Sequence, residues 1–210
     1  HDALPIYTLS LHDALPILLA EEQRKSLSLS QVRSQVSNGA LAIIQTAFPD
    51  IEDEPSLLSL RNRLVNYYKD NIVWHTQLYP GIDKLLAQLA ERDIPWGVVS
   101  NKPESLTRDI MQRLPLSYVP SAIIGGDTLA VAKPHPEPLW LAAEQCQTPA
   151  EHCWYIGDHY RDVIAAKAAG MLAIAASYGY ISTNESAHDW GADWVVDSPY
   201  QLLTLMQLSV

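Results

Sequence analysis

Two aspartates four positions apart, Asp158 and Asp162, follow the apolar run Cys153–Ile156 and Gly157. The run has the length of a buried parallel strand, and open α/β sheets bind ligands at the carboxyl ends of their strands. Two carboxylates held close together repel each other, and a bound divalent cation relieves that repulsion. Aspartates are also good residues for a helix N-terminus. This stretch alone leaves the metal-binding and helix-capping interpretations open.

Three polar residues upstream favour the metal-binding interpretation. Ser100 and Asn101 end an apolar strand pattern, and Lys133 stands just before a proline-punctuated turn. A hydroxyl, an amide and a lysine are suitable donors for the oxygens of a phosphoryl group, and carboxylates are suitable ligands for Mg²⁺. Each residue alone is a weak signal, but the order SN, KPHPEP and GDHYRD is specific. The sequence therefore predicts a site for a phosphate ester and Mg²⁺.

These motifs resemble those of the haloacid dehalogenase superfamily of phosphatases. Ser100 matches the second motif of that family, Lys133 the third, and Asp158 with Asp162 the fourth. The phrases GGDTLAVAKPHPEPL and GDHYRDVIAAKAAGM are most similar to phosphoglycolate phosphatases. The phrases PWGVVSNKP and SYGYISTNESAHDWGADWVVDSP are also similar to N-acetylmuramic acid 6-phosphate phosphatases. The resemblance runs from Leu18 to the C-terminus and is strongest over Tyr79–Val196.

The resemblance implies an α/β fold, with a doubly wound (Rossmann-like) parallel sheet and a small helical cap domain. It implies a Mg²⁺-dependent phosphatase of a small phosphorylated metabolite, such as phosphoglycolate or a sugar phosphate. In that mechanism an aspartate attacks phosphorus, and water hydrolyses the resulting aspartyl-phosphate. Asp158 and Asp162 would hold the metal ion, with Asp162 in a supporting role. Ser100, Asn101 and Lys133 would bind the phosphoryl group.

The first motif of that family, DxDGT, supplies the nucleophilic aspartate, and neither DxD nor DGT occurs in this chain. Asp13 follows the alternating pattern YTLSL, so it is one alternative nucleophile, and Asp2 is another. Asp13 is followed by Ala-Leu-Pro rather than by x-Asp-Gly-Thr. We therefore expect the chain as it stands to be catalytically inactive.

The segment 1–17 contains HDALPI twice, separated by YTLSL. Back-translated, YTLSLHDALPI resembles a widely used short-read sequencing adapter, and concatenation of adapters would repeat its end. We hypothesise that residues 1–17 are a non-native segment that replaces the native first strand and its DxDGT motif. In that case the central position of the sheet is left open, or is filled by Tyr7–Leu11.

Amphipathic patterns over Ser30–Phe48 and Ser56–Asp70 predict a small helical bundle in residues 18–79, and the resemblance implies that this bundle is the cap. Residues 80–210 are expected to form the α/β core without its native first strand, because strand and helix patterns alternate there. We interpret four aromatic residues of the first region mainly as packing residues and His135 as an exposed loop residue. The four are Tyr67, Tyr68, Trp74 and His75.

The composition excludes several other classes of protein. A formal net charge of −10 argues against nucleic acid and acidic membrane surfaces as partners. Cys146 and Cys153 lack metal-ligand spacing, and we interpret them as buried or inert thiols of a cytoplasmic protein. No apolar run has the length of a membrane span. The expected partner is a small phosphorylated metabolite, and no sequence feature indicates an oligomeric state.

Two other functions are consistent with part of the pattern. A non-catalytic phosphate-binding module would retain Ser100, Lys133 and Asp158 but would only sense its ligand. A receiver-type signalling domain also arranges Asp, Ser or Thr, and Lys around Mg²⁺. The helical region 18–79 and the GDxxxD spacing disfavour a receiver domain.

Overall fold

The computed structural model describes residues 6–7, 11–28, 31–32, 39–71, 77–179, 181 and 185–208. The chain divides into two compact units. One unit combines His1–Tyr7 with Gln77–Val210, and the other is Thr8–Thr76. Each unit is described below by itself.

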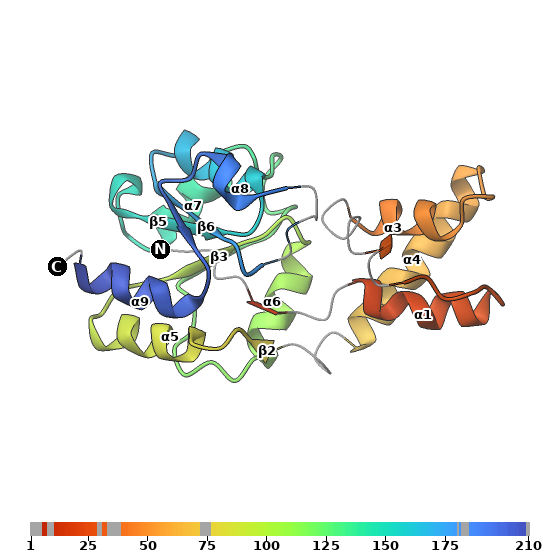
Figure 1. Cartoon of the computed structure of the whole chain (residues 1–210), viewed down its shortest axis with the longest axis horizontal. Coiled ribbons are helices and arrows are strands. Elements are labelled where there is room, and N and C mark those ends of the chain that lie inside the picture. The colour runs from red at the N-terminus through yellow and green to blue at the C-terminus, as the bar shows by residue number, and fades with distance from the viewer. Residues whose placement is uncertain are drawn as a thin grey trace. The chain divides into compact units, whose positions relative to one another are not determined.

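The larger unit contains five parallel strands in two ladders (Figure 1). In the first ladder β3 pairs with β4, with Val98 opposite Ile123. In the second, β6 lies between β5 and β7, with Ile174 opposite both Ile156 and Trp194. The five strands are β3 (Gly97–Val99), β4 (Ala122–Ile124), β5 (Trp154–Gly157), β6 (Leu172–Ala176) and β7 (Trp194–Val196).

Helices alternate with these strands along the chain, which confirms the predicted α/β class with parallel strands. The α-helices of this unit are α5 (Ile82–Glu91), α6 (Glu104–Arg113), α7 (Glu137–Gln145), α8 (Tyr160–Ala168) and α9 (Pro199–Leu208). Two 3₁₀ turns, η2 (Ala150–His152) and η3 (Ala187–Trp190), precede β5 and β7. Gly81 begins α5 with φ 100°, a left-handed conformation that favours glycine.

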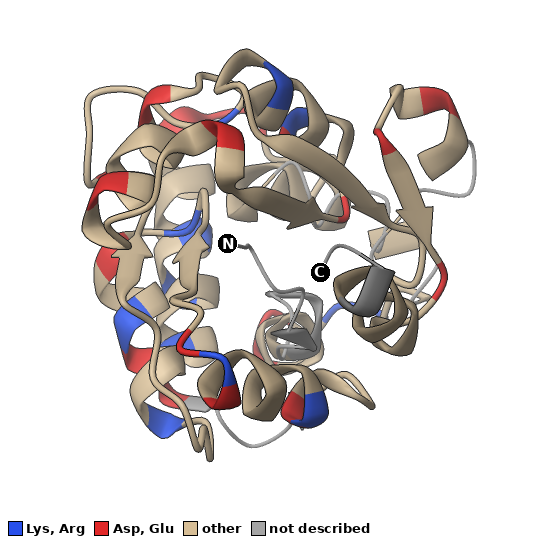
Figure 2. Ribbon diagram, turned by 90° about the vertical axis from the view of Figure 1, so that its left-hand side faces the viewer, with Lys and Arg blue, Asp and Glu red and all other residues tan. Residues whose placement is uncertain are grey.

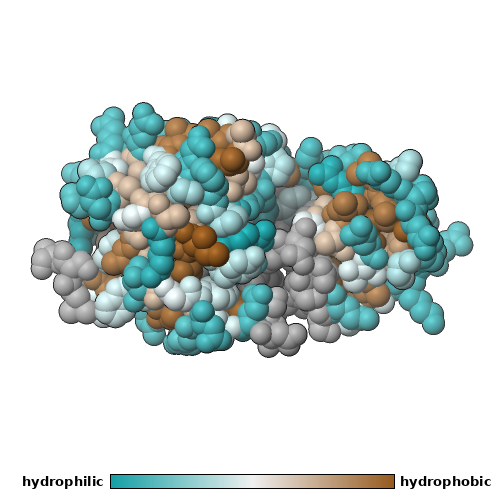
Figure 3. Space-filling model, turned by 90° about the horizontal axis from the view of Figure 1, so that it is seen from above, coloured by the Kyte–Doolittle hydropathy of each residue, from teal (hydrophilic) through white to brown (hydrophobic). Residues whose placement is uncertain are grey.

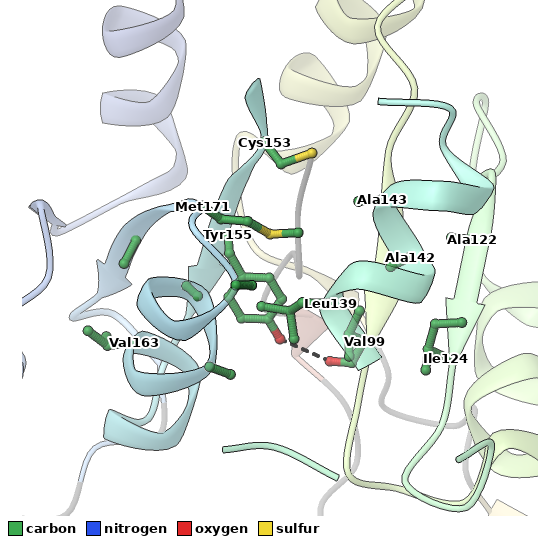
Figure 4. Close-up of a cluster of buried hydrophobic side chains, with 14 of the residues drawn as sticks. Val99, Ala122, Ile124, Leu139, Ala142, Ala143, Cys153, Tyr155, Val163 and Met171 are labelled. Atoms are coloured by element: carbon green, nitrogen blue, oxygen red, sulfur yellow. Dashed lines mark hydrogen bonds between the residues drawn. The ribbon is translucent and has the colours of Figure 1, made fainter. Parts of the chain in front are cut away.

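A buried core joins the two ladders to helices α7 and α8 (Figure 4). Val99 and Ile124 of the first ladder and Tyr155 of the second contribute side chains to one cluster with Leu139 of α7. Cys146 and Cys153 are free thiols that are 4% and 1% exposed, so both belong to this core, as the sequence predicted. Strands β3, β5 and β6 consist almost entirely of buried residues, so they appear in the sequence as continuous apolar runs.

The smaller unit consists of packed helices. Its described helices are α1 (Leu11–Glu21), α3 (Ala40–Ala47) and α4 (Glu54–Asn71). Leu18, Ile44, Leu64 and Tyr68 are each almost completely buried in it. Arg63 of α4 forms ion pairs with Glu21 and Glu22 at the end of α1, and these join the two helices at the surface.

Two predictions for this unit change in detail. A single helix was expected over Ser30–Phe48, but α3 begins only at Ala40, because Gly39 precedes it with a left-handed φ of 90°. Residues 31–32 are helical, and residues 33–38 lie outside the described residues. Tyr68 is buried, as expected of a packing residue, while the Tyr67 hydroxyl donates to the Glu21 carboxylate. Trp74 and His75 lie outside the described residues.

The segment around the HDALPI repeats adopts two different structures. Strand β1 (Ile6–Tyr7) pairs antiparallel with β2 (Gln77–Leu78), separately from the parallel ladders. The second repeat forms part of helix α1. Asp13 therefore lies within a helix of the smaller unit and not directly after a strand, while Tyr7 of the expected Tyr7–Leu11 strand belongs to β1 and Leu11 belongs to α1. Asp2 and residues 8–10 lie outside the described residues.

The surface carries charges of both signs. Figure 2 shows acidic and basic residues interspersed along the helices that face the viewer, and α6 illustrates this with the ion pairs Glu104–Arg108 and Asp109–Arg113. In Figure 3 the hydrophobic surface forms separate patches among hydrophilic residues. In the described part of the chain, no helix is both long and apolar enough to cross a membrane.

Candidate active site

The predicted site residues come from three loops of the larger unit. Ser100 and Asn101 follow β3, Lys133 lies between β4 and α7, and Asp158 follows β5. The carboxyl ends of parallel strands face the same edge of a sheet, so these loops converge there. Hydrogen bonds and close contacts between the loops fix the arrangement.

The Lys133 ammonium contacts three groups of the site at once. Its Nζ lies 2.8 Å from the Val99 carbonyl oxygen, 2.8 Å from the Tyr155 hydroxyl and 2.8 Å from Oδ1 of Asp162. The Lys133 side chain is only 10% exposed. Burial by itself lowers the pKa of Lys133, but attraction to Asp162 and Tyr155 outweighs burial, so the pKa is raised. Lys133 is therefore a fixed cation at neutral pH.

Asp162 is the partner of Lys133 and part of its own helix terminus. Its Oδ2 accepts a hydrogen bond from the His159 N–H at 3.2 Å, while Oδ1 faces Lys133. A Cβ added at Gly157 would lie 2.2 Å from the Cβ of Asp162, so only glycine fits at the end of β5. Gly157 thus leaves room for the Asp162 side chain, which both caps helix α8 and forms the buried ion pair with Lys133.

Asn101 holds the loop that carries Lys133. Its Nδ2 donates to the Lys133 carbonyl oxygen at 2.9 Å, and its Oδ1 accepts from the Lys133 N–H at 3.1 Å. Because both ends of the amide are engaged by the same residue, Asn101 orients the lysine backbone. The sequence predicted Asn101 as a phosphate-binding residue, and these contacts favour a positioning role.

Ser100 lies at the end of β3, with its backbone anchored to the neighbouring strand. Its N–H donates to the Ile124 carbonyl oxygen at 2.9 Å, and its Oγ accepts from the Lys102 N–H at 3.1 Å. The serine hydroxyl keeps its own proton available for a further acceptor.

The loop after β4 packs closely against the loop after β3. A Cβ added at Gly125 would lie 2.2 Å from the backbone nitrogen of Glu104, and one at Gly126 would lie 2.3 Å from the Asn101 carbonyl oxygen. Asp127 accepts a hydrogen bond from the Glu104 N–H at 2.6 Å, which caps α6. The two glycines therefore permit a close backbone approach between the loops.

Asp158 is half-buried at the carboxyl end of β5. The turn after β6 lies directly against it, because a Cβ added at Gly179 would be 2.2 Å from the Cβ of Asp158. Carboxylate oxygens at such an edge are the ligands that Mg²⁺ prefers. The donor chemistry of Asp158 therefore fits a hard divalent cation.

Two residues near the site were not among those predicted. Tyr155 donates a hydrogen bond to the Val99 carbonyl oxygen at 3.2 Å and so connects β5 to β3, as Figure 4 shows. The pKa of Lys102 is lowered, mainly by burial and further by the like charge of Lys133, although the Asp158 carboxylate opposes this shift. Tyr155 was hidden within an apolar strand pattern. Lys102 was visible in the SNK sequence, but its burial was not.

His135 stays outside this group. It is exposed, as predicted, and its Nδ1 accepts a hydrogen bond from the Glu137 N–H at 3.3 Å.

His159 caps the N-terminus of α8. Its Nδ1 accepts from the Arg161 N–H at 3.2 Å, and this bond requires an unprotonated Nδ1. Burial lowers the pKa of His159, and Arg161 lowers it further, against the opposing effects of Asp162, Glu185 and Asp158. The folded protein therefore favours the neutral imidazole.

We expect His159→Asn to flatten the pH dependence of stability. Below about pH 6.5 the unfolded chain protonates His159 more readily than the folded chain does, so the stability contributed by the neutral imidazole is lost as the pH falls. Asparagine retains a capping side chain but does not titrate. Urea denaturation between about pH 7.5 and about pH 5 should show a steeper loss in the wild type than in the variant. If stability fell equally with pH in the wild type and in His159→Asn, the neutral His159 imidazole would not contribute to the stability of the folded protein.

Comparison with known proteins is consistent with this geometry. A profile described as "Haloacid dehalogenase-like hydrolase" matches residues 10–176. A phosphoglycolate phosphatase of Xanthomonas campestris pv. campestris is 37% identical over 185 residues, covering 88% of this chain and 83% of the relative. An N-acetylmuramic acid 6-phosphate phosphatase of Pseudomonas putida is 34% identical over 185 residues, with the same coverage of 88% and 83%.

A solved structure shows the same fold. The crystal structure of a predicted phosphoglycolate phosphatase from Haemophilus somnus superimposes with a TM-score of 0.83 at 24% identity, covering 94% of this chain and 90% of that one. These findings confirm the resemblance inferred from the SN, KPHPEP and GDHYRD motifs. The chain belongs to the haloacid dehalogenase-like hydrolase family.

Proposed function

We propose that this chain carries the phosphate-ester site of a Mg²⁺-dependent phosphatase for small phosphorylated metabolites. The names of the two relatives denote phosphoglycolate and N-acetylmuramic acid 6-phosphate. In both molecules the phosphate is esterified to a hydroxyl group of a compound that also carries a carboxylate. This shared chemistry supports phosphorylated small acids, including acidic sugar phosphates, as the substrate class.

The observation that carries the proposal is the charge balance at the carboxyl ends of the strands. Lys133 is paired with Asp162, but the Lys102 ammonium has no hydrogen bond or ion pair to any residue that the structure describes. Lys102 is half-buried, a cation there without a partner is costly, and a bound anion removes that cost. A phosphoryl dianion near Ser100, Lys102 and Lys133 would supply the missing negative charge.

We assign the metal ligand to Asp158 and a supporting role to Asp162. Both oxygens of Asp162 are engaged, one by Lys133 and one by the His159 N–H. Mg²⁺ in phosphate-handling sites is held by one or two carboxylates together with phosphate oxygens and water. A bound ion would neutralise charge on the phosphoryl group.

Lys133 can reach a phosphate oxygen by exchanging one of its present acceptors. All three of its N–H donors are in use, at Val99, Tyr155 and Asp162. The Val99 carbonyl oxygen also accepts from the Tyr155 hydroxyl, so it keeps a donor if Lys133 turns away. We propose that phosphate replaces Val99 as an acceptor, while Asp162 continues to hold the ammonium.

We expect Lys102→Met to weaken the binding of inorganic phosphate and phosphoglycolate by about tenfold or more, because a charge-assisted contact is lost. Titration calorimetry with saturating Mg²⁺ measures both affinities. Lys167→Met is the matched control, because Lys167 pairs with Asp193 at the surface with 48% of its side chain exposed. If the wild type binds neither ligand, the phosphate-site proposal fails.

The alternative is a non-catalytic phosphate-binding module. The absence of DxD from the chain favours it, because the phosphate-binding residues do not by themselves supply a nucleophile. Phosphate binding is expected under either function, and turnover separates them, as set out in the Discussion.

A further inference from the structure

The phenol hydroxyl of Tyr178 is buried and has no hydrogen-bond partner within the part of the chain that the structure describes. Leaving a buried hydroxyl unpaired costs free energy. Native proteins contain few such groups, and each has an explanation such as a bound ligand, an ordered water molecule or local strain. The position of the Tyr178 hydroxyl in the fold indicates which of these explanations holds.

In the described residues of the larger unit, Oε1 of Gln88 and Nε1 of Trp96 share this property but lie away from the site. Gln88 is on helix α5, and Trp96 precedes β3 at its amino end. Tyr178, in contrast, lies in the turn directly after β6, at the carboxyl edge where Ser100 and Asp158 also lie.

The turn that carries Tyr178 is fixed against the Asp158 side chain. A Cβ added at Gly179 would lie 2.2 Å from the Cβ of Asp158 and 2.6 Å from its Oδ2, so the backbone next to Tyr178 contacts this carboxylate. The Tyr178 ring packs edge-to-face against Tyr79, with ring centroids 5.1 Å apart and an interplanar angle of 73°. Backbone and ring are thus both held in place.

The hydroxyl is suited to donate a hydrogen bond to an anion. Burial raises the pKa of Tyr178, and Tyr79 and Asp158 raise it further, so the phenol keeps its proton at neutral pH. The Asp158 carboxylate is near enough to raise this pKa, but it does not accept a hydrogen bond from the hydroxyl. An oxygen of a ligand bound beside Asp158 is therefore the natural acceptor.

We propose that Tyr178 is a substrate-binding residue, whose hydroxyl donates a hydrogen bond to a phosphoryl oxygen of the ester held beside Asp158. This inference rests on the proposed phosphatase site. It assigns a direct contact to a residue outside the Ser100, Lys133 and Asp158 motifs.

The test compares Tyr178→Phe with the wild type in the full chain. With saturating Mg²⁺, the dissociation constant of inorganic phosphate should rise about tenfold, because a hydrogen bond to a charged acceptor is lost. Without ligand, the unfolding temperature should stay equal or rise, because the variant no longer buries an unpaired hydroxyl. Tyr118→Phe is the matched control: its hydroxyl donates to the Ile94 carbonyl oxygen, so stability should fall while phosphate affinity stays unchanged.

Equal phosphate affinity in Tyr178→Phe and the wild type would overturn the inference and leave the phosphatase proposal intact. The inference would also be overturned if Tyr178→Phe weakened Mg²⁺ binding, measured without phosphate, by as much as it weakens phosphate binding. The hydroxyl would then act on the cation and not on the phosphoryl group. If the wild type binds no phosphate, the proposed function fails together with this inference.

Discussion

Hydrolysis of phosphate esters by the 210-residue chain is expected to remain at the uncatalysed background. A version in which the native upstream sequence replaces residues 1–17 is expected to be about 10⁴-fold faster or more. The physical reason is that covalent phosphoryl transfer needs a nucleophilic carboxylate, and the chain contains no DxD. Binding residues alone position the ester without attacking it. The assay is phosphate release from phosphoglycolate, N-acetylmuramic acid 6-phosphate and other sugar phosphates with Mg²⁺.

The matched control is Asp13→Asn in the 210-residue chain. Asp13 lies in helix α1 of the smaller unit, so the substitution should change nothing. Turnover by the chain as it stands, abolished by Asp13→Asn, would show that Asp13 is the nucleophile. Failure of both versions on every ester would favour the non-catalytic module. Resequencing the genomic locus tests the adapter hypothesis separately, and a locus that encodes HDALPIYTLSLHDALPI would refute it.

Asp162→Asn is expected to lower the free energy of unfolding by about 3–5 kcal/mol, because it leaves the Lys133 ammonium buried without its counter-charge. The Asp162 side chain is 9% exposed and that of Lys133 is 10% exposed, so solvent screens the pair weakly. The change also replaces an acceptor of the His159 N–H at the start of α8. Urea denaturation at neutral pH measures the loss.

The matched control for this prediction is Asp109→Asn, which removes an exposed ion pair with Arg113 on helix α6. Such pairs contribute about 0.3–0.5 kcal/mol. Combining Asp162→Asn with Lys133→Met should recover part of the stability, because the unpaired charge is then absent. A loss in Asp162→Asn no larger than in Asp109→Asn would show that the buried pair contributes little.

The sequence by itself determined most of the α/β unit. Apolar runs of strand length alternate with helical patterns over residues 80–210, and the structure has strands and helices in the same alternation. The family was also readable, because Ser100, Lys133 and Asp158 occur in motifs with fixed local neighbours. Local patterns suffice here because β3, β5 and β6 consist almost entirely of buried residues, so they are continuous apolar runs in the sequence.

Helix and strand bounds near the N-terminus were less readable. The alternating YTLSL pattern predicted a strand over Tyr7–Leu11, but among its described residues only Tyr7 lies in a strand, and α1 begins at Leu11. Gly39 likewise divides a continuous helical pattern, because its φ of 90° is not visible in hydrophobic periodicity. Short apolar segments are compatible with either a strand or a helix, and packing against distant residues decides between them.

Only the tertiary structure decided what each polar group of the site contacts. The sequence could assign Asn101 to phosphate and Asp162 to metal, but the fold directs Asn101 to the Lys133 backbone and Asp162 to the Lys133 ammonium. It also brings Tyr155 to Val99, 56 positions apart in the chain. Burial and charge pairing depend on residues that are far apart in the sequence, whereas a motif contains only local spacing. The unpaired hydroxyl of Tyr178 could therefore be identified only from the tertiary structure.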